Sequence, residues 1–310
     1  MIMSVTSPLH VSILGLPEVS HSTLAGLADV FRVFPLLRGM SDSIPDEPPF
    51  SVSVVGDKRQ QHVPFRVEKS IDEITCTDIV IVPALLVSTT DWLPGDYSRI
   101  VSWMKTMHAH GAMLCSACSG ALLLAQTGLL EGDKATTHWA YADLFRRCFP
   151  GVELRLEHLL VRSGERGEIV MSGASGSWHD LALYLIANHV SLAAAQTIAK
   201  FLLLEWHADG QIPFMIFTPP REHGDAVILQ AQDWLDANLS EPNPVESMVR
   251  HSGLPARTFK RRFTRAVGHT PIKYVQLLRI EAAKRRLERT AIPVDRIACL
   301  VGYEDPAFFR

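Results

Sequence analysis

One stretch of the chain carries residue types whose spacing could do chemistry, the segment 111–130, GAMLCSACSGALLLAQTGLL. An apolar run leads into Cys118, and a helical pattern begins almost at once after it. This is the layout of a nucleophile elbow, in which a side chain stands exposed on a sharp turn between a strand and a helix. Because a helix N-terminus lowers the pKa of a nearby thiol, the layout predicts a reactive Cys118. His138 follows twenty residues later and offers an imidazole.

Plainer interpretations of these residues stay open. Cys118 could be a small buried residue that fills a turn, and His138 could form only local hydrogen bonds. Cys115 and Cys118 make a CxxC pattern, but Cys115 falls on the expected strand and the proline of a thioredoxin-like motif is missing. His108 and His110 stand two apart on an expected helix, so their rings would not face each other. We expect no metal site and no cofactor.

Strand-like and helical patterns alternate over the first 210 residues. The expected strands lie at 10–16, 50–55, 78–82, 112–114 and 169–171. The expected helices lie at 22–38, 93–110, 119–128, 139–147 and 175–190. This alternation predicts a doubly wound α/β sheet, in which sites lie at the carboxyl ends of the strands. The elbow at Cys118 would then stand at such a strand end.

The elbow and the ATTHW motif at 135–139 resemble the PfpI-type, class I glutamine amidotransferase-like fold. The resemblance covers roughly residues 8–205. It implies a flavodoxin-like α/β domain with Cys118 as the elbow thiol and His138 as its neighbour.

Two departures from that family argue against catalysis. Enzymes of this fold use an acidic side chain at the position that matches Thr23, and a threonine cannot hold a proton as a carboxylate does. The family's glycine pair after the strand VIVP is replaced by Ala84 and Leu85, which bears on any oxyanion hole. We therefore expect a ligand site without catalytic residues, in which aromatic rings could hold an amine. The expected lining is Thr23, Ala84, Cys118, Ser119, His138, Trp139 and Trp178.

The segment 250–289 carries the densest charge of one sign, with twelve Lys and Arg against two Glu, a net +10. Such a surface suits a polyanion. Phe259, Phe263 and Val267 recur every four residues and predict a buried helical face. The opposite face carries Arg257, Lys260, Arg261 and Thr264. A solvated basic helix is the plain alternative.

The residues around this basic helix predict a helix-turn-helix. A helix is expected from Pro244, and Gly253 supplies the freedom for a tight turn before the basic helix. In this motif the second helix enters the major groove of DNA. A long helix is expected at 271–287, with its arginines and lysines outward. Its expected inward residues are Tyr274, Leu277, Leu278, Ile280 and Leu287.

The segments 292–298 and 305–310 repeat the first unit's plan around a turn at 302–303. The whole of 225–310 resembles the AraC-type DNA-binding domain, an all-α fold with two helix-turn-helix units. Pro255 stands where the family usually has a capping Ser, and the chain stops at Arg310 inside the expected second recognition helix, so we expect an incomplete second unit. The expected DNA contacts are Arg257, Thr258, Lys260, Arg261, Thr264, Lys273 and Arg285.

The pairing of these two domains resembles the GlxA-type regulators. We expect a sensor domain at 8–210, a proline-stiffened linker at 211–224 and the helical domain at 225–310. The resemblance implies a transcriptional regulator that binds promoter DNA and senses a small metabolite, such as an amine or amino-acid relative. Its expected partners include RNA polymerase and a second copy of the chain, joined through the N-terminal domain. The alternative is a Cys-dependent hydrolase or hydratase that uses Cys118 and His138.

The composition points to the cytoplasm. The net charge of −3 divides into +4 for residues 221–310 and −7 for the first 220. Five cysteines, an odd count, suggest free thiols in a reducing compartment. The N-terminus lacks the pattern of a signal peptide, and no run reaches the roughly 18 apolar residues of a membrane span. We therefore expect a soluble cytoplasmic protein without a membrane partner.

Overall fold

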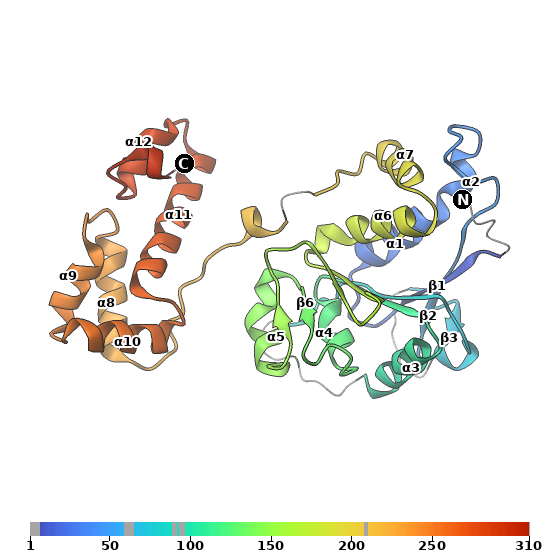
Figure 1. Cartoon of the computed structure of the whole chain (residues 1–310), viewed down its shortest axis with the longest axis horizontal. Helices are drawn as coiled ribbons and strands as arrows, with labels where there is room; N and C mark the ends of the chain where they lie inside the picture. The colour runs from blue at the N-terminus through green and yellow to red at the C-terminus, as the bar shows by residue number, and fades with distance from the viewer. Residues whose placement is uncertain (1–6, 59–64, 89–91, 93–96, 208–209, 310) are drawn as a thin grey trace. The chain divides into compact units, whose positions relative to one another are not determined.

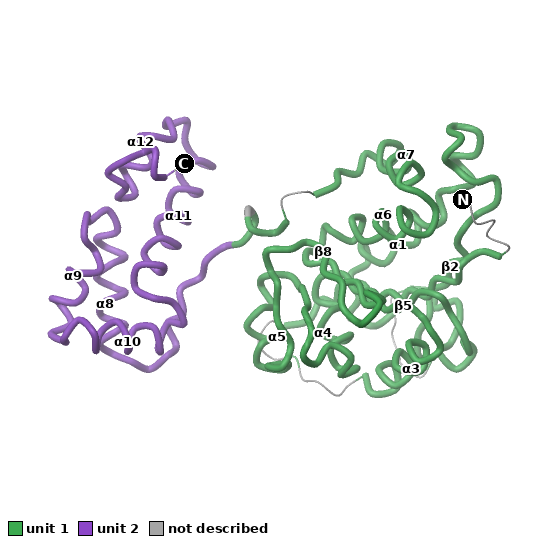
Figure 2. The backbone as a smooth tube through the Cα atoms, viewed as in Figure 1, with its two compact units in different colours: residues 1–215 green, residues 216–310 purple. Residues whose placement is uncertain are grey.

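The computed structural model describes residues 7–58, 65–88, 92, 97–207 and 210–309. The chain divides into two compact units, Met1–Met215 and Ile216–Arg310 (Figure 2). The first four residues of the helix expected at 93–110, and Arg310, lie outside the described residues.

Unit 1 is built on a seven-stranded sheet in the order β3-β2-β1-β4-β5-β9-β8 (Figure 1). Every neighbouring pair is parallel except β8 and β9, which are antiparallel. The strands are β1 (Leu9–Leu14), β2 (Phe50–Gly56), β3 (Lys69–Ser70), β4 (Ile79–Val82), β5 (Met113–Ala117), β8 (Leu160–Ser163) and β9 (Ile169–Ser172). A separate parallel pair joins β6 (Lys134–Ala135) to β7 (Glu153–Leu154).

The helices of unit 1 cover both faces of the sheet. They are α1 (His21–Arg32), α2 (Phe34–Leu37), α3 (Ser98–Ala109), α4 (Gly120–Ala125), α5 (Ala142–Cys148), α6 (Trp178–His189) and α7 (Leu192–Leu202). Helices α1 and α6 lie together on one face, and α3 and α4 lie on the other (Figure 1). All four residues of β4 are buried, as expected for a strand that is covered on both sides. The prediction of a doubly wound α/β domain is confirmed.

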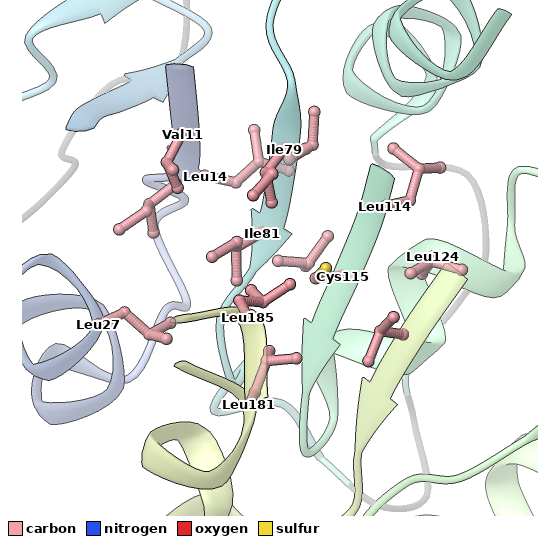
Figure 3. Close-up of a cluster of buried hydrophobic side chains, with 14 of the residues drawn as sticks. Val11, Leu14, Leu27, Ile79, Ile81, Leu114, Cys115, Leu124, Leu181 and Leu185 are labelled. Atoms are coloured by element: carbon pink, nitrogen blue, oxygen red, sulfur yellow. The ribbon is translucent and has the colours of Figure 1, made fainter. Parts of the chain in front are cut away.

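The core of unit 1 forms where the central strands meet α1 and α6. Leu27 of α1 and Leu181 and Leu185 of α6 lie beside Ile81 of β4 (Figure 3). Cys115 of β5 belongs to the same cluster and is 0% exposed. Burial of this kind supplies the main drive for folding.

Some elements differ from the sequence prediction. The helix expected at 22–38 is two helices, because the chain breaks at Val33 and Pro35 stands in the first turn of α2. Proline suits a first turn but has no N–H to continue the preceding helix. Strand β8 and helix α7 were not predicted, and the helices expected from 139 and 175 each begin with a 3₁₀ turn, η2 (Trp139–Tyr141) and η3 (Ser175–Ser177).

The segment after α7 belongs to unit 1 as far as Met215. Gln211, expected at the start of the linker, is 1% exposed. Its side-chain amide donates to Thr136 Oγ1 at 3.2 Å and to the Thr137 carbonyl at 3.0 Å. A short 3₁₀ turn, η4 (Ile212–Phe214), follows.

Unit 2 is all helical. Its helices are α8 (Ala226–Ala237), α9 (Pro244–Ser252), α10 (Ala256–Val267), α11 (Pro271–Arg289), α12 (Val294–Leu300) and α13 (Pro306–Phe309). Phe259, Phe263 and Val267 are all buried, as their spacing predicted. Phe263 meets Tyr274 edge-on at 5.3 Å between ring centres, so this face of α10 packs on α11. Gly253 ends α9 with a φ of 65°, which glycine adopts without strain.

The long helix α11 differs from the prediction in which residues it buries. Tyr274 and Leu278 are buried as expected, but Ile280 is 36% exposed and Leu287 is 45% exposed. Arg279, expected outward, is only 8% exposed. The apolar pattern did not reveal that a charged side chain would occupy the interior here. None of the described helices is long and apolar enough to cross a membrane.

Candidate ligand site and nucleic-acid interface

The elbow forms at the carboxyl end of β5. Cys118 follows the strand with a φ of 56°, a left-handed conformation that is uncommon outside glycine, and α4 begins two residues later. The Cys118 amide donates to the Ser172 carbonyl at 2.8 Å, which ties the turn to the end of β9. Strained turns of this kind cluster at functional sites.

The Cys118 thiol is buried, and its surroundings favour the protonated form. Cys118 is 1% exposed, and its Sγ lies 3.0 Å from Ser175 Oγ. Burial raises the pKa of the thiol, against the opposing effect of hydrogen bonds from Ser175 and Ser119. The expectation of a lowered pKa is therefore wrong, because the loss of water outweighs the groups that favour the thiolate.

His138 lies on a segment that is tied to the elbow, and its Nδ1 is engaged within its own turn. Thr137 Oγ1 donates to the Cys118 carbonyl at 3.0 Å, which holds the segment there. His138 Nδ1, however, accepts a hydrogen bond from the Ala140 amide at 3.1 Å and caps η2. Burial lowers the pKa of His138, which favours the neutral ring. Burial therefore disfavours the charged form of both groups, whereas nucleophilic catalysis needs a thiolate.

Two backbone amides that could serve an oxyanion, those of Leu85 and Leu86, are already engaged. The Leu85 amide donates to Ser119 Oγ at 2.8 Å, and that hydroxyl donates to the Leu85 carbonyl at 2.6 Å. The Leu86 amide donates to the Glu18 carbonyl at 2.6 Å. Ala84, which replaces a glycine of the family pattern, is buried, and its carbonyl accepts from the Ser20 amide. An oxyanion hole needs free donors aimed at the reacting atom.

The remaining predicted ligand residues lie at different depths around this segment. Thr23 is 1% exposed and donates to Ser20 Oγ at 3.2 Å. Trp139 is half-buried and stacks at a tilt on His138, with ring centres 5.2 Å apart. Trp178 packs against α1, where a Cβ on Gly26 would come within 2.5 Å of its indole. The Trp178 ring is therefore partly used to join α6 to α1.

Sequence reasoning missed three residues of the site. Ser175 contacts the thiol from the turn after β9, and Tyr141 donates from its hydroxyl to the Val87 carbonyl at 3.0 Å. Burial, followed by the nearby Cys118, raises the pKa of Tyr141. Glu18 Oε2 is buried and has no hydrogen-bond partner among the described residues. For Ser175 the run SGASGS at 172–177, which begins at the last residue of β9, was an available signal, since sites lie at the carboxyl ends of parallel strands.

The other candidate motifs of unit 1 are structural. Cys115 lies in the core on β5, and burial raises the pKa of its thiol, so the CxxC pattern does not form an accessible redox pair. His108 Nε2 lies 3.5 Å from Glu168 Oε1, while His110 ends α3.

The basic face of α10 is open to solvent, as predicted. Arg257, Lys260, Arg261 and Thr264 are exposed, and Thr258 is half-buried. Lys273 and Arg285 on α11 are also exposed. Arg262 is set apart, because its guanidinium pairs with Asp225 at the start of α8. No acidic residue lies on α10 to offset its positive charge.

Comparison with known proteins identifies both units. Residues 50–179 match the DJ-1/PfpI family, and residues 248–310 match a helix-turn-helix domain. This chain joins a DJ-1/PfpI domain to a helix-turn-helix domain. The resemblance to a PfpI-type domain followed by an AraC-type helix-turn-helix domain is confirmed.

Two transcriptional regulators are similar to this chain over about two thirds of its length or more. The HTH-type transcriptional regulator CdhR of Pseudomonas aeruginosa is 26% identical over 222 residues, which cover 68% of this chain and 62% of CdhR. The HTH-type transcriptional regulator GlxA of Rhizobium meliloti is 23% identical over 221 residues, or 71% of this chain and 66% of GlxA. The match thus spans less than two thirds of these relatives.

Two further similarities concern the DJ-1/PfpI domain. Isonitrile hydratase of Pseudomonas putida is 31% identical over 100 residues, 32% of this chain and 41% of that enzyme. The crystal structure of a putative transcriptional regulator from Vibrio parahaemolyticus superposes with a TM-score of 0.54 at 17% identity. It covers 63% of this chain and 100% of that structure, and at this identity it supports the fold alone.

Proposed function

We propose that this protein is a sequence-specific DNA-binding transcriptional regulator whose DJ-1/PfpI domain binds a small molecule without turning it over. The observation that carries the proposal is the exposed, uncompensated basic face of α10, on the second helix of a helix-turn-helix. That helix is the one that reads base edges in the major groove. The similarity to named transcriptional regulators supports the same function.

Arg257→Ala should weaken specific DNA binding by roughly 1–3 kcal/mol, because arginine is the commonest reader of guanine edges. Lys273→Ala should weaken binding to all sequences alike, as expected for a phosphate contact. The test uses a duplex that the wild type selects from a random-sequence pool, and a scrambled duplex of the same length. Fluorescence anisotropy at fixed salt gives both dissociation constants.

The matched control is Arg146→Ala, which removes an exposed arginine of α5 and should bind both duplexes as the wild type does. If Arg257→Ala retains wild-type affinity for the selected duplex, α10 is not the reading helix. Equal losses on both duplexes would reassign Arg257 to a phosphate contact.

The non-catalytic sensor is favoured by the neutral state of the elbow. Burial disfavours the charged forms of both the Cys118 thiol and the His138 ring. Thr23 supplies no carboxylate, so the acidic side chain at this site is that of Glu18. The competing function is a Cys-dependent hydratase or hydrolase. The similarity to isonitrile hydratase supports this alternative. That enzyme shares only part of its length with this chain.

Cys118→Ser should leave turnover undetectable, as in the wild type, because neither protein has an activated nucleophile. It should still change the affinity for the effector, since Cys118 and Ser175 meet at the elbow. The measurement is steady-state hydration or hydrolysis of isonitriles, amides and glyoxals by both proteins. Robust turnover by the wild type that Cys118→Ser abolishes would establish the enzyme instead.

The effector we infer is a small amine or amino-acid relative. Glu18 Oε2 is buried without a described partner, and a cation would satisfy it. The half-buried ring of Trp139 is a second group that attracts a cation. We further infer that the regulator acts with RNA polymerase and as a homodimer joined through the DJ-1/PfpI domain, in the cytoplasm. A thermal-shift screen of metabolites on the full chain would find the effector, because binding to the native state raises its melting temperature.

A further inference from the structure

Two imidazoles and a carboxylate converge at the start of α6, away from the elbow thiol. Asp180 lies in the first turn of that helix and is 0% exposed. Its Oδ2 lies 2.9 Å from His207 Nδ1 and 3.5 Å from His179 Nε2. The three potential ligand atoms all lie within 4.8 Å of one another. No spacing motif could have shown this, because His207 comes from the segment after α7.

We propose that His179, Asp180 and His207 bind a zinc ion. Zinc bonds of about 2.0–2.1 Å in tetrahedral geometry place neighbouring ligand atoms roughly 3.3 Å apart. The two distances from Asp180 Oδ2, 2.9 Å and 3.5 Å, bracket that value. Two histidines and one carboxylate with a fourth position open form a known zinc set.

The charge at this cluster favours a cation. Within the described residues, the ion-pair partners of the buried Asp180 carboxylate are the two imidazoles. A buried carboxylate is costly unless a positive charge compensates it. An imidazole supplies that charge only when it is protonated, whereas a divalent ion supplies it while both rings stay neutral.

The surroundings provide access and orientation. A cavity of about 290 Å³ is lined by Asp180 and His207 together with Glu157, His158 and Trp206. It leaves room for the ion to enter and for a water molecule to occupy the fourth position. The His207 amide donates to Asp180 Oδ1 at 2.9 Å, so the oxygen that does not bind the metal is held by the backbone. Such outer hydrogen bonds fix the direction of a ligand carboxylate.

Binding requires a change of partner at both imidazoles. His207 Nδ1 exchanges its hydrogen bond to Asp180 Oδ2, 2.9 Å away, for the metal. His179 Nε2 lies 2.8 Å from the Glu205 carbonyl, and it exchanges that partner for the metal. The ion then joins the first turn of α6 to the segment 205–207, close to where unit 1 ends at Met215. Zinc binding at this cluster does not depend on whether the protein binds DNA.

The test is calorimetric titration of ZnCl₂ into the full chain after chelator treatment and dialysis, with thermal melting as a second readout. The wild type should bind one zinc ion at this cluster and melt at a higher temperature with it. His179→Gln and His207→Gln should each weaken that binding at least tenfold, because each removes a ligand. Co²⁺ in place of Zn²⁺ should give the visible absorption of a tetrahedral ion.

His158→Gln is the matched control, since His158 lines the same cavity but is not a proposed ligand. It should bind zinc as the wild type does, within about twofold. The proposal is overturned if the wild type binds no zinc, if either ligand variant binds as tightly as the wild type, or if the His158 variant loses as much as they do. A pH-dependent melting difference without zinc binding would instead mark the cluster as a proton-controlled ion pair.

Discussion

Arg279→Met should destabilise the helix-turn-helix domain by roughly 3–5 kcal/mol, because the substitution orphans two carbonyls and removes charge-assisted hydrogen bonds. Arg279 is 8% exposed, and its guanidinium donates to the Leu239 carbonyl at 3.1 Å and the Glu241 carbonyl at 2.6 Å. It also lies 5.6 Å from the centre of the Tyr303 ring. One side chain of α11 thereby joins the loop after α8 to the turn after α12.

The measurement is native-state hydrogen exchange of the full chain, which reports the opening free energy of α8 and α11 separately from that of the DJ-1/PfpI domain. Arg286→Met, an exposed arginine on the same helix, is the matched control and should change little. Arg279→Lys should give an intermediate loss, because an ammonium group cannot reproduce the fork of a guanidinium. If α8 and α11 of the Arg279→Met variant exchange their amide hydrogens as slowly as in the wild type, the hydrogen bonds of the guanidinium add no stability.

Gly120→Ala should destabilise the DJ-1/PfpI domain by about 3 kcal/mol or more, at the upper end of the cost of overpacking. A Cβ on Gly120 would lie 2.5 Å from the Pro83 carbonyl oxygen and 2.6 Å from that of Val82. Both atoms are backbone at the end of β4, so neither can move as the tip of a side chain could. The roughly 1 kcal/mol by which alanine favours a helix over glycine does not offset this clash.

Gly176→Ala is the matched control, because a Cβ at Gly176 would meet nothing within 4 Å. Urea unfolding followed by circular dichroism should show a large loss for Gly120→Ala and a small change for Gly176→Ala. If the two variants unfold alike, α4 does not need its close approach to β4.

The sequence by itself was sufficient to predict features that depend on residues close together in the chain. The alternation of strands and helices indicated a doubly wound sheet, and Phe259, Phe263 and Val267 indicated the buried face of α10. The sharp turn at Cys118 was likewise predicted from the layout of strand and helix, and only its left-handed φ came from the structure. Each of these depends on residues a few positions apart, which set backbone geometry and the direction of side chains.

Only the tertiary structure decided the chemical state of those residues. The Cys118 sulfur meets Ser175, 57 positions away, and the loss of water raises its pKa where the local helix predicted a decrease. Arg279 reaches Leu239 across 40 positions, and His207 reaches Asp180 across 27. Desolvation and pairing depend on which distant segments pack together. A local pattern therefore predicts where a side chain stands on its element, whereas the packed fold determines whether it is charged, bonded or buried.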